Sequence, residues 1–166
     1  MKIGILADTH DNLDAVSYWM EFLNQQEADV LIHAGDFVSP FVVPVLERFQ
    51  GPVYGVYGNN DGDRETLHKK AQGTDITLSE SYERLELSGA VFGVAHKPSD
   101  LPEQRSPDVT LYVHGHTHER KWNNQSSVPV ANPGEAGGWL TGTSSALMVR
   151  TDSSPLQHQF HLVPSP

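Results

Sequence analysis

The sequence contains no cysteine among its 166 residues. That absence excludes a disulfide framework, a thiol nucleophile, and zinc or iron–sulfur sites that are held by thiolates. A chain of this length fits one domain and can bury a core large enough to fold without disulfides or a structural metal site. We therefore predict a single domain that spans residues 1–166.

Basic residues and long apolar runs are also scarce. Eleven Lys and Arg stand against 21 Asp and Glu, which gives a net charge of −10. Because nucleic acids are bound mainly by neutralising their phosphates, extended nucleic-acid binding is not expected. The apolar run at residues 1–7 is too short for a signal peptide, and no later run approaches the ~20 residues of a membrane span. We expect a soluble, cytoplasmic protein with no membrane partner, and homo-oligomerisation is left open.

The first half of the chain alternates buried strands with helical segments. Apolar runs bounded by turn residues predict the strands, and apolar residues at three- and four-residue steps predict the first helix. Such a βαβαβ order is typical of a parallel sheet with helices packed on it. The expected strands are 2–7, 29–33 and 53–57, and the expected helices are 12–26 and 38–49, the second weakened by Pro44.

The second half has less helix and more strand. Residues 82–87 and 90–95 flank Ser88-Gly89 and predict a hairpin. The simplest architecture is one domain of two packed sheets with helices outside. Further strands are expected at 109–113, 117–122, 128–131, 144–150 and 156–162.

Five polar clusters directly follow apolar runs, where strands should end. Because sites in parallel sheets form beyond the carboxyl ends of strands, all five could converge on one rim. The clusters are Asp8-Thr9-His10, Gly35-Asp36, Gly58-Asn59-Asn60-Asp61, Ala95-His96-Lys97 and Gly115-His116-Thr117-His118.

These residue types favour a pair of divalent transition metals. Carboxylates and neutral imidazoles suit Mn²⁺, Fe²⁺, Zn²⁺, Ni²⁺ or Co²⁺. Seven candidate ligands are too many for one tetrahedral zinc and suit two ions that share a carboxylate, for which Asp36 is the natural bridge. We expect Mn²⁺ first and leave the other four open. The candidate ligands are Asp8, His10, Asp36, Asn59, His96, His116 and His118.

A dinuclear centre points to phosphate ester chemistry. Two ions about 3.5–4 Å apart can hold a hydroxide between them and clamp the attacking and leaving oxygens of an in-line displacement. Since bound metal lowers the pKa of water toward neutrality, no separate strong base is needed. The expected reaction is hydrolysis of a small phosphate ester through metal-bound hydroxide, without a covalent enzyme intermediate.

The ordered motifs resemble the calcineurin-like metallophosphoesterases, and the short length resembles their small YfcE-type phosphodiesterase branch. Each motif is weak alone, but the ordered set from about residue 1 to about residue 150 is specific. The resemblance implies an α/β fold, a four-layer αββα sandwich of two mixed β-sheets flanked by helices, and a metal-dependent phosphodiesterase. The motifs are Asp8-x-His10, Gly35-Asp36, Gly58-Asn59-x-Asp61, His96 and Gly115-His116-x-His118.

The resemblance also implies a role for each residue. Apart from the resemblance, Asn60 could shape a polar turn or steady a phosphate oxygen, and Asp61 is expected to orient a neighbour. Asn60, Asp61 and Asp36 form the expected catalytic set. The first metal would be held by Asp8, His10, Asp36 and His118, and the second by Asp36, Asn59, His96 and His116.

Three positions depart from the family pattern. Many members carry a histidine at the position of Asn60, where it contacts the phosphate and protonates the leaving group. An amide cannot deliver a proton near neutral pH, so Asn60 favours diesters with good leaving groups. Lys97 stands where a glycine is common. Two positions remain possible for its side chain, beside the bound phosphate or in solvent. Glu135 follows an Asn132-Pro133-Gly134 turn in place of a small hydroxyl residue, and no role beyond shape is assigned to that turn.

Two other functions remain alternatives. The first is a weakly catalytic or non-catalytic protein-interaction scaffold of the same fold, which the complete ligand set disfavours. The second is a phosphomonoesterase or a nuclease at the same site, and a nuclease should show a basic groove. Among the remaining residues, His33 and His114 are expected beside the site. Surface or packing roles are expected for His68, His158 and His161, and packing roles, rather than a base-stacking platform, for Trp19, Trp122 and Trp139.

Overall fold

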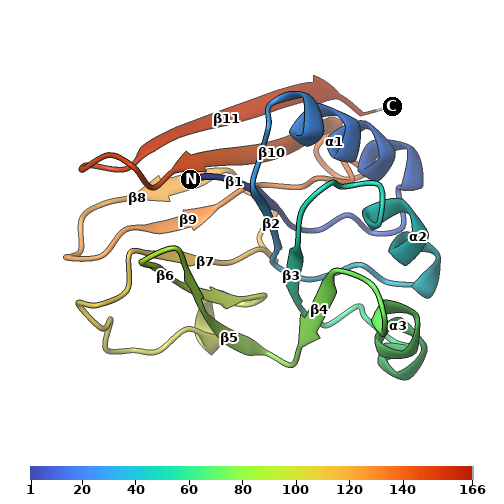
Figure 1. Ribbon diagram of the computed structural model, residues 1–166, viewed down its shortest axis with the longest axis horizontal. Coiled ribbons are helices and arrows are strands. Elements are labelled where there is room, and N and C mark those ends of the chain that lie inside the picture. The colour runs from blue at the N-terminus through green and yellow to red at the C-terminus, as the bar shows by residue number, and fades with distance from the viewer. Residues whose placement is uncertain (166) are drawn as a thin grey trace.

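The computed structural model describes residues 1–165 and arranges them as two packed β-sheets with helices (Figure 1). The six-stranded sheet has the order β11-β10-β1-β2-β3-β4, and the five-stranded sheet has the order β5-β6-β7-β9-β8. The first sheet contains β1 (Lys2–Leu6), β2 (Val30–His33), β3 (Val53–Val56), β4 (Ile76–Ser79), β10 (Thr143–Arg150) and β11 (Gln157–Pro164). The second contains β5 (Tyr82–Leu87), β6 (Ala90–Ala95), β7 (Leu111–Val113), β8 (Lys121–Asn123) and β9 (Val130–Asn132).

Both sheets are mixed, as the resemblance implied. Strands β1 to β4 run parallel, and β10 joins them antiparallel to β1. In the second sheet, β6, β7 and β9 are parallel, whereas β5 and β8 pair antiparallel at its two edges. The predicted βαβαβ order and the 82–95 hairpin are therefore confirmed.

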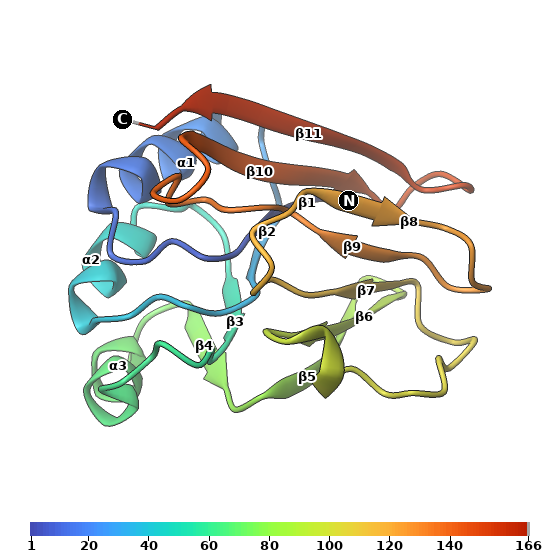
Figure 2. The same cartoon turned by 180° about the vertical axis from the view of Figure 1, so that it is seen from behind.

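Helices cover one face of the six-stranded sheet, where Figures 1 and 2 show α1, α2 and α3 side by side. Their bounds are α1 (Leu13–Gln25), α2 (Val43–Leu46) and α3 (Arg64–Ala71). Helix α1 begins because the Asn12 side chain accepts a hydrogen bond from the Ala15 amide. It buries Trp19 and Leu23, and Gly4 of β1 leaves room for Leu23, which a Cβ there would meet at 2.7 Å.

Alternating side chains of the inner strands fill the space between the sheets. Ile3 and Ile5 of β1 pack in one cluster with Phe92 and Val94 of β6. The period-two pattern of these strands thus buries one face against the other sheet. This continuous apolar layer holds the carboxyl ends of the parallel strands of one sheet next to those of the other sheet.

The outer face of the five-stranded sheet is covered by segment 96–110. Leu101 and Val109 of this segment pack on Val91 and Tyr112 of the sheet. The segment contains one short 3₁₀ turn, η2 (Pro98–Asp100). The fourth layer of the sandwich is therefore a loop with one helical turn.

Three element predictions differ from the structure. The helix expected at 38–49 was too long: it is the 3₁₀ turn η1 (Pro40–Val42) followed by α2, which ends at Leu46. The strand expected at 117–122 begins only at Lys121, because the preceding residues form a loop. Helix α3 and strand β4 were not predicted, since α3 buries only Leu67 and Ala71 and therefore lacks a wide apolar stripe.

Within residues 1–165, none of the helices combines the length and the apolar character that crossing a bilayer requires. The cytoplasmic location stays a prediction.

Candidate metal centre

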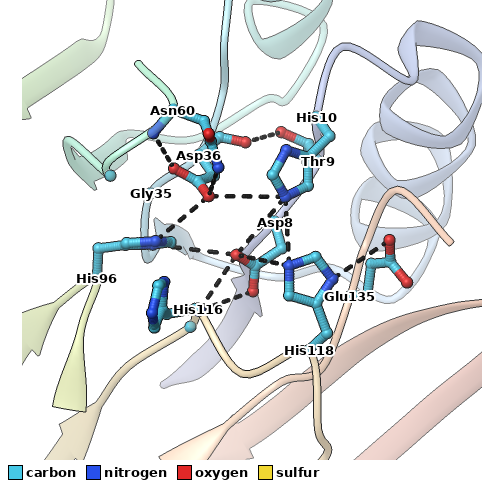
Figure 3. A network of polar contacts seen from close by, with 12 residues as sticks. Asp8, Thr9, His10, Gly35, Asp36, Asn60, His96, His116, His118 and Glu135 are labelled. Atoms are coloured by element: carbon cyan, nitrogen blue, oxygen red, sulfur yellow. Dashed lines mark hydrogen bonds and ion pairs between the residues drawn. The ribbon is translucent and has the colours of Figure 1, made fainter. Parts of the chain in front are cut away.

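The predicted ligands all lie on loops that leave the carboxyl ends of neighbouring parallel strands. Asp8 and His10 follow β1, Asp36 follows β2, and Asn59 follows β3. The second sheet contributes His96 after β6, and His116 with His118 after β7. Figure 3 shows the side chains of His10, His96 and His118 pointing toward the carboxylates of Asp8 and Asp36.

The Asp8 carboxylate lies at the bottom of the centre and is fully buried. Its Oδ1 atom lies 3.7 Å from His118 Nε2 and 4.0 Å from His10 Nε2. The His116 amide donates to Oδ2 at 3.0 Å, which ties the β7 loop to the β1 loop. Two sets of candidate ligand atoms share Asp8: one adds His10 and His118, and the other adds Asp36 and His96.

Asp36 lies between the two histidine groups. Its Oδ2 atom is 3.3 Å from His96 Nε2 and 3.6 Å from His10 Nε2. The side chain is 1% exposed, and Gly58 is required beside it because a Cβ there would lie 2.1 Å from Asp36 Oδ1. The glycine therefore leaves the space that this carboxylate occupies.

The His96 ring is oriented by the backbone of the other sheet. Its Nδ1 atom lies 2.9 Å from the Ala34 carbonyl oxygen. Since a carbonyl oxygen can only accept, Nδ1 carries the proton and Nε2 faces the centre. There Nε2 lies 3.2 Å from Asn59 Oδ1, so an imidazole, an amide oxygen and the Asp36 carboxylate converge.

His118 is supported by Glu135, for which no role was predicted from the sequence. The buried Glu135 carboxylate has its Oε1 atom 3.3 Å from His118 Nδ1, while His118 Nε2 faces Asp8 and lies 3.4 Å from His10 Nε2. A carboxylate behind a metal-binding histidine fixes the ring orientation and the position of its proton. The available signal was an acidic residue within a segment of small and apolar residues, 131–138.

His116 occupies a more open position than the other histidines. Its side chain is exposed, and its ring lies edge-on to the His96 ring with the centroids 5.1 Å apart. Burial, His96 and the nearby charge of Lys97 lower the pKa of His116, which favours the neutral imidazole that binds metal. Its assignment as a ligand stays a prediction, as do the other assignments of individual ions.

Asp61 holds the loops rather than facing the histidines. Its carboxylate accepts hydrogen bonds from the amides of Asp36, Val38 and Gly58 at 3.2, 2.6 and 2.6 Å. Val38 has a φ of 80°, an unfavourable angle for a β-branched residue, and its bond to Asp61 helps to maintain it. The Asp61 carboxylate thus joins the Asp36 loop to the Gly58 turn, and its part in catalysis stays a prediction.

The Asn60 side chain contacts Asp36. Its Nδ2 atom donates to Asp36 Oδ2 at 2.8 Å, and its backbone amide donates to Asp36 Oδ1 at 2.8 Å. Burial alone would raise the pKa of Asp36, but the contact with His96 and the hydrogen bonds from Asn60 outweigh it and hold the pKa below its usual range. Contact between Asn60 and a phosphate stays a prediction.

Backbone strain is concentrated at the centre. Left-handed φ angles cost non-glycine residues free energy and persist where surrounding contacts enforce them. Five of the seven predicted ligands adopt them: Asp8 at 55°, His10 at 44°, Asp36 at 60°, His116 at 69° and His118 at 58°. The left-handed loop around His116 and His118 is also why the expected strand at 117–122 starts late.

The donor set fits divalent metal ions. Two carboxylates that are at most 1% exposed face imidazole nitrogens, and burying such charges is costly without a cation or a full set of hydrogen bonds. Burial raises the pKa of Asp8 to about 6, against the opposing effects of His118 and His96. Imidazole nitrogen together with carboxylate oxygen suits Mn²⁺, Fe²⁺ or Zn²⁺.

Comparison of the sequence with known proteins identifies the family of this chain. A family model of the calcineurin-like phosphoesterase superfamily domain matches residues 1–154. The chain belongs to this superfamily. Its sequence is 33% identical over 156 residues to phosphodiesterase MJ0936 of Methanocaldococcus jannaschii, a match that covers 92% of this chain and 94% of the relative.

Solved structures of this superfamily share the fold. An archaeal phosphodiesterase structure superposes with a TM-score of 0.84 at 30% identity, covering 98% of this chain and 100% of the other. The YfcE phosphoesterase of E. coli covers 100% of both chains with a TM-score of 0.73 at 22% identity, which supports the fold alone. The resemblance to the superfamily is confirmed, and the fold of YfcE is shared. The chain is a phosphoesterase of the metallophosphoesterase superfamily, and this family uses divalent metal ions.

The histidines and tryptophans outside the ligand set lie where they were expected, except for Trp139. His33 contacts Thr9 Oγ1 at 3.1 Å and His114 Nδ1 lies 2.9 Å from the Gly115 carbonyl, so both lie beneath the loops of the centre. Trp19 is buried in the core and Trp122 stacks on His158. The packing role expected for Trp139 was wrong, because its side chain is 60% exposed at the rim of the centre.

Proposed function

We propose that the chain is a metal-dependent phosphodiesterase that hydrolyses a small phosphodiester at a dinuclear centre. The observation that carries this proposal is the position of Asp36, whose Oδ2 atom faces His96 at 3.3 Å and His10 at 3.6 Å. A carboxylate oxygen between two histidine groups supports a bridging role. The superfamily supplies the phosphoesterase chemistry, and the homologue named a phosphodiesterase supports diesters.

When bound, two divalent ions would supply a nucleophile by lowering the pKa of water and would polarise the phosphoryl group. Seven side chains would hold them: Asp8, His10, Asp36, Asn59, His96, His116 and His118. Ala34 and Glu135 orient the rings of His96 and His118 through their Nδ1 atoms, so that Nε2 is the free ligand atom. Asp61 fixes the backbone of the Asp36 loop and of the Gly58 turn.

Residue Asn60 favours diesters over monoesters. Its amide lies at the edge of the centre and can turn from Asp36 to donate a hydrogen bond to a phosphate oxygen. It cannot protonate a leaving oxygen. The expected substrate is therefore a phosphodiester whose leaving group departs as a stabilised anion. Mn²⁺ remains the first expected ion.

Single-metal reconstitution tests the proposal. The apo-protein is loaded separately with Mn²⁺, Ni²⁺, Fe²⁺, Zn²⁺ and Co²⁺, and turnover of bis(p-nitrophenyl) phosphate is compared with that of p-nitrophenyl phosphate. We expect faster turnover of the diester with at least one metal, and its loss in Asp36→Asn. Faster turnover of the monoester would favour the phosphomonoesterase. Absence of turnover with every metal, at confirmed occupancy, would favour the scaffold.

A further inference from the structure

Two consecutive large apolar side chains are exposed at the rim of the metal centre. Trp139 is 60% exposed and Leu140 is 78% exposed, although the protein buries most of its large apolar residues. Exposed apolar surface beside a site typically marks a binding surface. The pair lies on the Gly-rich loop 134–142, for which the family motifs give no role.

The backbone of this loop is fixed before any ligand binds. The buried Glu135 carboxylate accepts hydrogen bonds from the Leu140 amide at 2.9 Å and from the Thr141 amide at 2.9 Å. The Gly142 amide donates to the Gly138 carbonyl at 3.0 Å and closes the turn. A surface held in this way loses little conformational entropy on binding.

The Trp139 ring is also held in place. Its Nε1 atom donates to the backbone carbonyl of His10 at 3.0 Å. The polar edge of the indole is thereby satisfied by the loop that carries a predicted metal ligand. What the exposed ring offers to a ligand is apolar surface suited to stacking.

Trp139 and Leu140 line a hollow of about 500 Å³ that reaches the metal ligands. His10 and His118 form its polar side, and Val38 adds to its apolar side. No Lys or Arg belongs to the lining among the described residues, and the buried Glu135 carboxylate does. An anionic group would therefore be disfavoured in the apolar part of the hollow.

We propose that Trp139 and Leu140 form a subsite for a flat, uncharged, aromatic arm of the phosphodiester. This inference rests on the proposed function, because the phosphoryl group must lie at the metal ligands for its arm to reach the pair. The arm stacks on the indole and packs against Leu140, and its chemical class is an aryl or heteroaryl group. The subsite lies on loop 134–142 and contributes to binding of the arm.

Binding of two phosphonates to the Mn²⁺-loaded protein tests the subsite without turnover. Phenylphosphonate and methylphosphonate present the same anionic group with and without a ring, and calorimetry gives a Kd for each. Stacking on an aromatic side chain predicts that the wild type binds phenylphosphonate about 10-fold or more tightly. Trp139→Ala should reduce this ratio toward one, Leu140→Ala should reduce it in part, and Trp139→Phe should keep most of it.

Phe41→Ala is the matched control. Phe41 is an aromatic residue that is 70% exposed and does not line the hollow, so the ratio should equal that of the wild type. Thermal melting of each variant checks its fold. Equal affinities for both phosphonates in the wild type, or an unchanged ratio in Trp139→Ala, would overturn the subsite. A wild-type dimer that Trp139→Ala converts to monomers, with an unchanged ratio of the two phosphonate affinities, would also overturn the subsite. Failure of both phosphonates to bind would instead contradict the phosphate site of the proposed function, and the subsite with it.

Discussion

The Oε1 atom of Glu135 lies 3.3 Å from Nδ1 of His118, behind the imidazole that faces Asp8. The same carboxylate accepts the amides of Leu140 and Thr141 and the Thr141 hydroxyl. Burial would raise the pKa of Glu135, but these hydrogen bonds and His118 together lower it, so the group is a carboxylate near neutral pH. One buried side chain thus connects a predicted metal ligand to the exposed loop beside it.

Replacement of this carboxylate should weaken metal binding. In Glu135→Gln the side chain keeps its size but loses the charge that faces His118. Changes behind a metal ligand typically cost 10–100-fold in metal affinity, and we expect a loss in that range. Titration of the apo-protein with Mn²⁺ measures it. Glu80→Gln, which removes an exposed carboxylate that pairs with Arg64, is the matched control. Equal affinities in wild type and Glu135→Gln would show that Glu135 acts only on the loop.

Loss of the Asp61 carboxylate should loosen the two loops that it joins. In Asp61→Asn one oxygen becomes an NH₂ group that cannot accept, so either the Val38 amide or the amides of Asp36 and Gly58 lose their acceptor. Leaving a buried donor unsatisfied costs about 1–3 kcal/mol, and we expect the free energy of unfolding to fall by that amount. Urea denaturation measures the change. Asp63→Asn is the control, since Asp63 caps α3 through Thr66 and asparagine caps equally well. An unfolding free energy equal to that of the wild type would contradict this role of Asp61.

A histidine at position 60 should broaden the range of leaving groups. Asn60→His introduces a group that can protonate a leaving oxygen, and general acid catalysis contributes up to about 10²–10⁴-fold. We expect kcat for alkyl phosphodiesters to rise about 10-fold relative to kcat for bis(p-nitrophenyl) phosphate, whose leaving group needs no proton. The pH profile of the variant should gain an acidic group. Asn60→Gln serves as the control without a proton to deliver. An equal fall in kcat for all substrates would contradict the idea that Asn60 restricts the leaving group because it cannot donate a proton.

The hydroxyl of Ser144 should contribute to stability alone. It accepts from Trp19 Nε1 at 2.8 Å and donates to the Ala136 carbonyl at 2.5 Å, and it is fully buried. Ser144→Ala leaves the indole N–H without a partner, which costs about 1–3 kcal/mol. We expect lower stability in urea with unchanged Mn²⁺ affinity. Weakened metal binding in this variant would show that the strand supports the centre more directly than its contacts indicate.

The sequence predicted the centre better than it predicted the loops around it. Strand ends are visible as apolar runs that stop at Asp8, Asp36 or His96, and parallel strands bring such ends together. Helix α3 has few buried residues, so its Asp63 cap carries little information without the fold. Glu135 and Trp139 owe their roles to loop 134–142, whose path depends on hydrogen bonds to Asp8, His10 and Asn12 that are distant along the chain.

Metal stoichiometry measured together with turnover tests the central claim most directly. Apo-protein is titrated with Mn²⁺, bound metal is counted by native mass spectrometry, and hydrolysis of bis(p-nitrophenyl) phosphate is followed in the same samples. The account predicts that activity rises with the second ion and reaches its plateau at about two ions per chain, as a dinuclear centre requires. Full activity at one ion per chain, or two bound ions without turnover, would contradict it.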